Sequence, residues 1–323
     1  MRRDRLQNHV AGSVFTLPVC AVVAVLLWWF PLGQYRLDYA VGLGLATLIG
    51  YVLLETNNRF HLIRVRSRMV ASVWAVFAAI TASLHVWHEG MVVALCLAVA
   101  HLSLFYSYEQ RQPVKESFHA GLFLGVGSLF VPWLAVMPLL FMLHQVVYLR
   151  SFSLRCFFAT LIGSLFPAMV VLVPSILRSD YSRLTDWYAV LTSFKPISLD
   201  AYLALTLQQA VTWLLPSLLV LLGGIHYLCT SFNDKISVRM MLYICLTDAV
   251  VVLAFTALQP QHGDLLLASL LVSGSPLVAH FFALTHGWFT NFLFILSLLC
   301  CAAVGYVTLV MPTIPLSEII TIQ

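Results

Sequence analysis

The run MMLYICLTDAVVVLAFTAL, residues 240–258, decides the fold class, because it contains nineteen residues and one charged side chain, Asp248. Crossing about 30 Å of hydrocarbon at 1.5 Å per residue takes about 20 helical residues. Backbone N–H and C=O groups in lipid must bond internally, which leaves helices or closed barrels. The run lacks the two-residue alternation of a barrel strand, so it predicts a membrane-spanning helix.

The composition extends this interpretation to the whole chain. Its 323 residues are 61% hydrophobic and 9% charged, whereas an ordinary soluble domain has about 25% charged residues. A soluble protein of this length has too much outer surface in water to hide so many apolar side chains. No nucleotide-binding glycine motif occurs, which argues against ATP-driven work. We therefore expect an all-α polytopic transmembrane helical bundle.

Eleven apolar runs of similar length predict about eleven spans. The first follows Arg2, Arg3 and Arg5 but is too long for a secretion signal. The fifth and sixth are divided by Pro132-Trp133 and form either a full or a re-entrant hairpin. The expected spans are residues 14–32, 39–55, 70–87, 91–108, 117–131, 133–149, 156–177, 203–228, 240–258, 265–284 and 288–311.

Basic residues set the expected orientation. Thirteen of the seventeen lie in one set of loops, and only Arg36, Arg178, Arg183 and Lys195 lie in the other. Positive charge stays on the cytoplasmic side, so we expect a cytoplasmic N-terminus, an outer C-terminus and a bacterial inner-membrane location. The chain is predicted to be a single transmembrane domain over residues 1–323, with an outer interfacial loop at 178–202 and no soluble domain.

Asp248 is the sharpest candidate site, because it falls near the predicted bilayer midplane. A charged residue there costs roughly 2.5–3.5 kcal/mol on insertion scales. Asp248 therefore has two functional interpretations, a proton or cation site and the acid of a membrane-embedded enzyme. The structural alternative is a protonated or hydrogen-bonded residue that joins two helices. The next span contains Ser273, Gly274, Ser275 and Pro276 at a similar depth. Proline removes a helical N–H, which predicts either a simple kink or an unwound segment whose carbonyls line a cavity.

Two charged groups outside the spans are further candidates. Arg59, Arg64, Arg66 and Arg68 either set the topology or contact anionic lipid head groups or a lipid-linked phosphate. The second group consists of three acids and one base on the expected outer face. They either bind a phosphate or sugar substrate, or they are ordinary loop charges in contact with water. These outer-face candidates are Asp38, Asp180, Arg183 and Asp186.

No cofactor and no metal site is expected. The seven cysteines contain no CxxC pair, and His85 and His88 provide two ligands where a metal site needs three or four. Glycine pairs at Gly42/Gly44, Gly121/Gly125 and Gly223/Gly224 are expected to let helices approach closely.

Three stretches carry a resemblance to known proteins: LETNNRF at 54–60, HAGLFLGVGSLF at 119–130 and LRSFSLR at 149–155. They resemble an uncharacterised family of bacterial polytopic inner-membrane proteins over roughly residues 40–180, which implies the topology and no site. The order of basic turns and helices is also similar to integral-membrane glycosyltransferases that use polyprenyl-phosphate sugars. Those enzymes have an acidic motif on a long first outer loop, where this chain has Asp38 alone in a short one.

Three functions follow as expectations. The first is a secondary transporter of a small solute, with Asp248 at its centre and a polar cavity that reaches it. The second is a membrane-embedded enzyme of lipid-linked sugar metabolism, with the outer-face residues converging on one groove. The third is a non-catalytic membrane scaffold or assembly subunit. The expected partners are membrane lipids and a small solute or lipid-linked substrate, and nucleic acid is not expected.

Overall fold

A computed structural model describes residues 5–29, 37–194, 198–311, 313 and 315 of the chain, without the side chains of residues 183, 184 and 199. Every regular element in these ranges is a helix, and one isolated bridge joins Thr206 and Pro315. Four basic residues of the predicted charge partition lie outside the described residues: Arg2, Arg3, Arg36 and Lys195.

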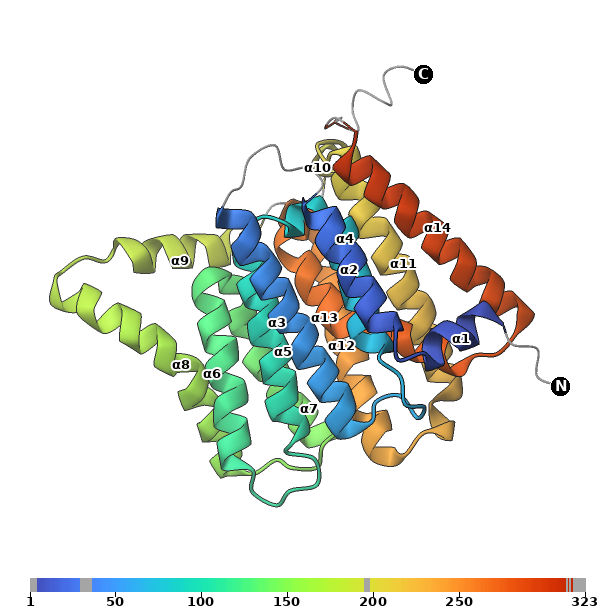
Figure 1. Ribbon diagram of the computed structural model, residues 1–323. Coiled ribbons are helices and arrows are strands. Elements are labelled where there is room, and N and C mark those ends of the chain that lie inside the picture. Colours follow the sequence, from blue (N-terminus) through green and yellow to red (C-terminus); the bar gives the residue numbers. More distant parts are fainter. Residues whose placement is uncertain (1–4, 30–36, 195–197, 312, 314, 316–323) are drawn as a thin grey trace. The chain divides into compact units, whose positions relative to one another are not determined.

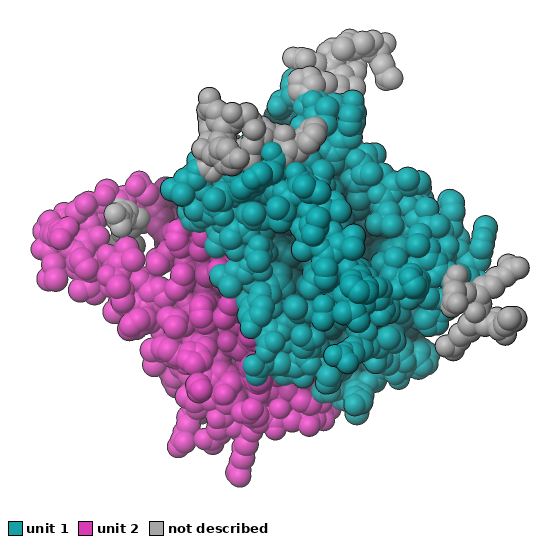
Figure 2. All heavy atoms as spheres, in the orientation of Figure 1, with its two compact units in different colours: residues 1–91, 197–323 teal, residues 92–196 magenta. Residues whose placement is uncertain are grey.

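The chain groups into two compact units, residues 1–91 with 197–323 (unit 1) and residues 92–196 (unit 2), coloured separately in Figure 2. The single transmembrane domain expected over residues 1–323 stays a prediction. Unit 1 contains the α-helices α1 (Leu6–Gly12), α2 (Thr16–Trp29), α3 (Leu37–Phe60), α4 (Met69–Ile80), α10 (Leu199–Leu203), α11 (Leu207–Thr230), α12 (Ile236–Leu258), α13 (Gly263–Leu284) and α14 (Trp288–Leu309). Its short 3₁₀ helices are η1 (Ala82–Leu84), η3 (Ser231–Asn233) and η4 (Pro260–His262).

Unit 2 is one contiguous segment that contains most of α5 and continues to α9 (Figure 1). Its last helix, α9, fills much of the predicted outer loop at 178–202, and the Trp187 indole N–H donates to the Ser128 carbonyl oxygen at 2.9 Å. Its helices are α5 (Glu89–Phe105, whose first turn belongs to unit 1), α6 (Val114–Phe130), η2 (Pro132–Val136), α7 (Met137–Val147), α8 (Leu154–Leu177) and α9 (Ser182–Thr192).

The helices support a multi-pass membrane protein. Six are long and apolar enough to cross a membrane: α3, α8, α11, α12, α13 and α14. A seventh span results if α1 and α2, which are bent by 93°, count as one. Each of the eleven predicted spans overlaps a helix, but several of these helices are too short to cross a membrane alone. Helix α4, for example, ends at Ile80, where the prediction continued to residue 87. The number eleven and the orientation of the termini stay predictions.

Helix α13 occupies the interior of unit 1. Of its most apolar stretch, 94% of the residues are buried, against 28–44% in the other five spans. It packs against α4, α11 and α12. Gly223 of α11 allows this approach, since an added Cβ would lie 2.9 Å from the Leu277 carbonyl oxygen. The polar side chains of α13 therefore meet protein on most sides.

In unit 2 the closest helix pair is α6 with α8. A Cβ added at Gly121 or Gly125 would collide with the backbone carbonyl of Thr160 or Ser164 on α8. In turn, a Cβ added at Gly163 on α8 would collide with the Phe118 backbone carbonyl on α6. The expected role of the Gly121/Gly125 pair in close packing is confirmed.

In the other two glycine pairs, Gly42/Gly44 and Gly223/Gly224, every glycine except Gly44 has a close neighbour. An added Cβ at Gly42 would collide with the His85 carbonyl oxygen, and one at Gly224 would lie 2.7 Å from the Leu246 side chain. Around Gly44 nothing lies within 4 Å, so its assignment to close packing was wrong.

We expect Gly125→Val to destabilise unit 2, because the valine methyl groups have no room against the Ser164 backbone. Overpacking of this kind costs about 1–3 kcal/mol, which thermal unfolding of the purified protein in detergent would detect as a lower Tm. Gly44→Val is the matched control, since it makes the same change on an open helix face. Equal Tm values for the two variants would contradict the close contact between α6 and α8.

Candidate functional site

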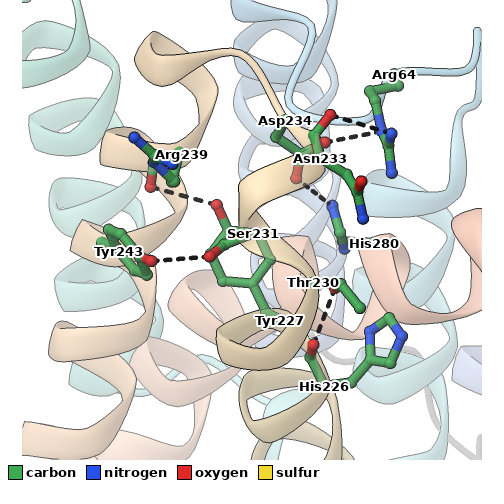
Figure 3. A network of polar contacts seen from close by, with 10 residues as sticks. All are labelled: Arg64, His226, Tyr227, Thr230, Ser231, Asn233, Asp234, Arg239, Tyr243 and His280. Atoms are coloured by element: carbon green, nitrogen blue, oxygen red, sulfur yellow. Dashed lines mark hydrogen bonds and ion pairs between the residues drawn. The ribbon is translucent and has the colours of Figure 1, made fainter.

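A buried ionic cluster joins three segments of unit 1 that are far apart in sequence (Figure 3). The Arg64 Nε atom lies 2.8 Å from Asp234 Oδ1, and His280 Nε2 lies 2.9 Å from Asp234 Oδ2. Arg64 Nη1 also donates to the Asn233 carbonyl oxygen at 3.2 Å. We call Arg64, Asp234 and His280 the Asp234 cluster.

Burial makes this cluster energetically sensitive. The Asp234 side chain is 0% exposed and that of His280 1%, whereas the Arg64 side chain is 44% exposed. A carboxylate removed from water needs both a counter-charge and hydrogen bonds, and removing one partner of such a pair is strongly destabilising. Arginine supplies a permanent positive charge. The half-exposed guanidinium therefore neutralises the carboxylate from the surface while the imidazole contacts it from inside.

The loop that carries Arg64 is fixed at several points. Leu62 and Ile63 are buried, and the Asn57 amide donates to the Ser67 carbonyl oxygen at 2.9 Å. The Ser67 hydroxyl then donates to the Ala11 carbonyl oxygen at 2.6 Å. Apolar anchors beside Arg64 and hydrogen bonds at both ends of the loop thus hold the guanidinium towards Asp234.

Asp234 is positioned by the turn between α11 and α12. Its N–H donates to the Ser231 carbonyl oxygen at 3.1 Å, closing the η3 turn. The Ser231 and Tyr243 hydroxyls are 2.9 Å apart, and the Tyr227 hydroxyl donates to the Arg239 carbonyl oxygen at 3.3 Å. These contacts tie the end of α11 to the first turns of α12, as Figure 3 shows.

His280 comes from the buried helix α13. Its ring meets the Tyr227 ring edge-on, with centroids 4.9 Å apart and an interplanar angle of 87°. Its Nδ1 atom is buried and has no hydrogen-bond partner within the described ranges. The imidazole therefore uses one nitrogen for Asp234 and keeps the other for a ligand, a water molecule or a proton.

Asp248 lies on the buried face of α12, with 0% of the residue exposed. It stands ten positions before Leu258, and Ser273 stands ten positions after Gly263 in the antiparallel neighbour α13. At 1.5 Å per residue both are about 15 Å from the turn that joins the helices. Sequence reasoning placed the two residues at the same depth, and the helix bounds agree.

The segment Ser273–Pro276 is not unwound. Helix α13 runs without a break through Ser273, Gly274, Ser275 and Pro276, and all four residues are buried. An added Cβ at Gly274 would collide with the Val220 side chain, so this glycine makes room for α11. Of the two structures predicted for this segment, the unwound one is wrong.

The polar cavity expected at Asp248 is not among the two cavities found in unit 1. One has a volume of about 70 Å³ and lies between α2, α4, α13 and α14. The other has about 270 Å³ and lies between α2, α3 and α4. Apolar side chains line both, and Asp248 lines neither. The Asp248 carboxyl group is itself fully buried in protein.

A second polar group lies at the opposite end of α13. The Gln209 amide donates to Asp264 Oδ2 at 2.7 Å, and Gln209 also completes a capping box with Thr206 at the start of α11. Burial lowers the pKa of His88 below its ordinary value, and the nearby Asp264 carboxylate partly opposes this shift. The start of α13 therefore combines a carboxylate, an amide and a neutral imidazole.

The outer-face candidates are distributed over both units. Asp38 begins α3 in unit 1, whereas Asp180, Arg183 and Asp186 belong to unit 2. Asp180 accepts hydrogen bonds from the N–H and hydroxyl of Ser182, at 3.1 and 2.7 Å. Asp186 is exposed, and the Arg183 side chain lies outside the described part of the chain. Nothing here supports a common groove for the four residues.

The four basic candidates have different surroundings. Arg64 belongs to the Asp234 cluster, and Arg59 forms an ion pair with Glu55. Arg68 Nη1 donates to the Val14 carbonyl oxygen at 3.4 Å, and Arg66 is exposed. Sequence reasoning listed Arg64 but missed its partner, Asp234. The signal was weak: an acid in a short basic turn and a histidine inside an apolar span, with no spacing that links them.

Comparisons with protein-family models, curated proteins and solved structures find no match for this chain. In the ranges that the structure describes, no three His, Cys, Asp or Glu side chains are placed to hold a metal ion. The polar groups at the two ends of α13, with Asp248 at the depth of its middle, form the candidate site.

We expect Arg64→Gln to lower the free energy of unfolding by about 3 kcal/mol at neutral pH, because it leaves the buried Asp234 carboxylate without its counter-charge. Thermal or denaturant unfolding in detergent, followed by tryptophan fluorescence, measures the loss. Adding Asp234→Asn should recover part of it, since the uncompensated charge is then removed.

The matched control is Arg66→Gln, which removes the same charge from an exposed position two residues along the same loop. Equal stability of Arg64→Gln and Arg66→Gln would show that the Asp234 cluster does not contribute to folding.

Proposed function

We propose that this protein is a secondary transporter that couples movement of a small solute to protons, with Asp248 as the proton-binding residue. The observation that carries the proposal is the place of Asp248, a fully buried carboxyl group halfway along the hairpin of α12 and α13. An ionisable residue at membrane depth is expensive and usually belongs to an ion or proton pathway.

The two ends of α13 support the same function. Asp264 lies at one end with Gln209 and His88, and Asp234 lies at the other with Arg64 and His280. Titratable groups thus lie at both ends of α13 and, on the neighbouring helix α12, at the depth of its middle. About 15 Å of helix separates Asp264 from the depth of Asp248 and about 20 Å separates Asp248 from Asp234, which is too far for direct proton transfer. Protons therefore need water or a conformational change to travel between them.

An occluded conformation explains why Asp248 is enclosed. Alternating access exposes a central site to one side at a time and closes it in between. The contact between α11 and α13 is close, because Gly223 lies against the Leu277 carbonyl oxygen and the Val220 side chain lies against Gly274, so we expect the two helices to move past each other as packed units. Sliding of packed helices is one of the common ways in which closed sites open.

We assign this function to a bacterial inner membrane. The partition of thirteen basic residues against four supports a cytoplasmic N-terminus, and the predicted odd number of spans then leads us to expect the C-terminus outside. With this orientation the Asp234 cluster faces the cytoplasm and Asp264 faces the outside. A lipid-linked sugar enzyme has less support, because no observation brings its candidate residues together.

We expect purified protein in vesicles to change the internal pH when its solute is added outside. The measurement uses trapped pyranine and a panel of amino acids, monosaccharides and short carboxylates. Asp248→Asn should abolish the response, because it removes the proton-binding oxygen. The control Asp186→Asn, at an exposed position of α9, should keep it. No response to any member of the panel, or an intact response in Asp248→Asn, contradicts the proposal.

A second measurement tests the occluded state directly. Ser273 is fully buried at the depth of Asp248, so Ser273→Cys should react with a membrane-impermeant maleimide only when the helices open. We expect labelling from both sides of the membrane, in excess of the native cysteines of the unmodified protein. A cysteine at this position that never reacts from either side shows permanent packing rather than a transport site.

A further inference from the structure

The larger cavity of unit 1 is a groove between α2, α3 and α4 with a volume of about 270 Å³. Its floor is buried and consists mainly of alanines, with Ala24, Ala46 and Ala71 as examples, and its rim includes the exposed residues Ala21 and Tyr51. An apolar cavity of about 150 Å³ already accommodates a benzene ring. The groove therefore has room for a longer hydrocarbon group that enters from the surface.

The polar atoms along the floor are already bonded to protein. The Trp74 indole donates to the Ala46 carbonyl oxygen at 2.9 Å, and the Trp28 indole donates to the Tyr39 carbonyl oxygen at 3.1 Å. At the rim, the Thr47 hydroxyl donates to the Leu43 carbonyl oxygen at 2.8 Å. A water molecule needs two to four polar partners in such a place, so hydrocarbon fits the floor better than water.

The two ends of the groove differ. One end is closed by Trp28, whose ring stacks on that of His85 at 4.1 Å, and His85 in turn contacts the Ala79 carbonyl oxygen at 3.0 Å through Nε2. The hydrogen bonds and the stacking fix Trp28 as a wall. A chain that lies in the groove must therefore enter from the other end or from the side.

The other end is basic. Arg68 is the N-cap residue of α4, and its guanidinium reaches the Val14 carbonyl oxygen, two residues before α2 begins. Arg59, in the last turn of α3, is paired with Glu55 of the same helix and does not line the groove. The exposed Arg68 guanidinium thus lies near the starts of α2 and α4, at one end of the groove. Basic residues at the end of membrane helices attract the phosphates of anionic lipids.

We propose that this groove is a binding site for one anionic glycerophospholipid, with an acyl chain on the alanine floor and the phosphate at Arg68. Apolar space alone would accept any hydrocarbon, but the positive charge of Arg68 at this end favours a chain that begins with a phosphate. The closed end at Trp28 limits how far the chain extends. This site is separate from Asp248 and does not depend on transport.

The test uses phosphatidylglycerol with a photoreactive diazirine in its acyl chain, incorporated into vesicles that hold the full-length protein. After irradiation, mass spectrometry of the peptides should place the label on α2, α3 and α4. Ala75→Phe, which fills the groove from α4, should abolish this labelling. Ala21→Phe fills it from the exposed rim and gives a second variant that folds even if the first does not. Ala302→Phe, at an exposed position of α14 outside the groove, should leave the labelling unchanged.

The head-group contact needs its own comparison. The same experiment with photoreactive phosphatidylcholine measures binding of the chain without a net negative charge. Arg68→Gln should reduce the preference for phosphatidylglycerol about fivefold, the effect of one basic residue near a membrane surface. Arg111→Gln, which removes a charge from an exposed loop of unit 2, should not change the preference. Equal labelling of Ala75→Phe and Ala302→Phe, or an unchanged preference in Arg68→Gln, overturns the proposal.

Discussion

Helix α13 is enclosed by α4, α11 and α12, and this enclosure constrains the rest of unit 1. A polar group on an enclosed helix has little access to water or lipid head groups, so its stable partners must come mainly from protein. Asp264 meets the Gln209 amide, and His280 meets the Asp234 carboxylate. Several features of the surrounding chain follow from these needs, including the capping box of α11 and the loop that presents Arg64.

The same enclosure separates two kinds of space. Between α13 and α11 the packing is tight, with Gly223 and Gly274 replacing side chains where the two helices approach. Between α2, α3 and α4 the small alanine side chains leave a groove instead. Small residues thus have opposite effects in one unit: where two backbones meet they close the space, and where three helices diverge they leave it open.

The sequence predicts the positions of the helices well, because the length of an apolar run is a direct consequence of membrane thickness. It also predicts that Asp248 and Ser273 share a depth, since both are counted from the same turn. It does not predict the Asp234 cluster, because Arg64, Asp234 and His280 are brought together only by tertiary packing. The continuous helix at Pro276 was likewise unpredictable, since membrane helices accommodate proline either with or without unwinding.

The order of the two units along the chain has a consequence for biosynthesis. Unit 2 is contiguous, so α6 and α8 can pack against each other soon after they are synthesised. Unit 2 interrupts unit 1 in the sequence, so contacts within unit 1 join segments that are far apart. The Gln7 amide donates to the Phe282 carbonyl oxygen, and Arg64 pairs with Asp234, which is synthesised much later. Because contacts between distant segments form late, the N-terminal helices must stay in the membrane without their final neighbours until α13 is made. Until Asp234 is synthesised, we expect the Arg64 guanidinium to lie at the membrane surface among lipid head groups, without its acidic partner.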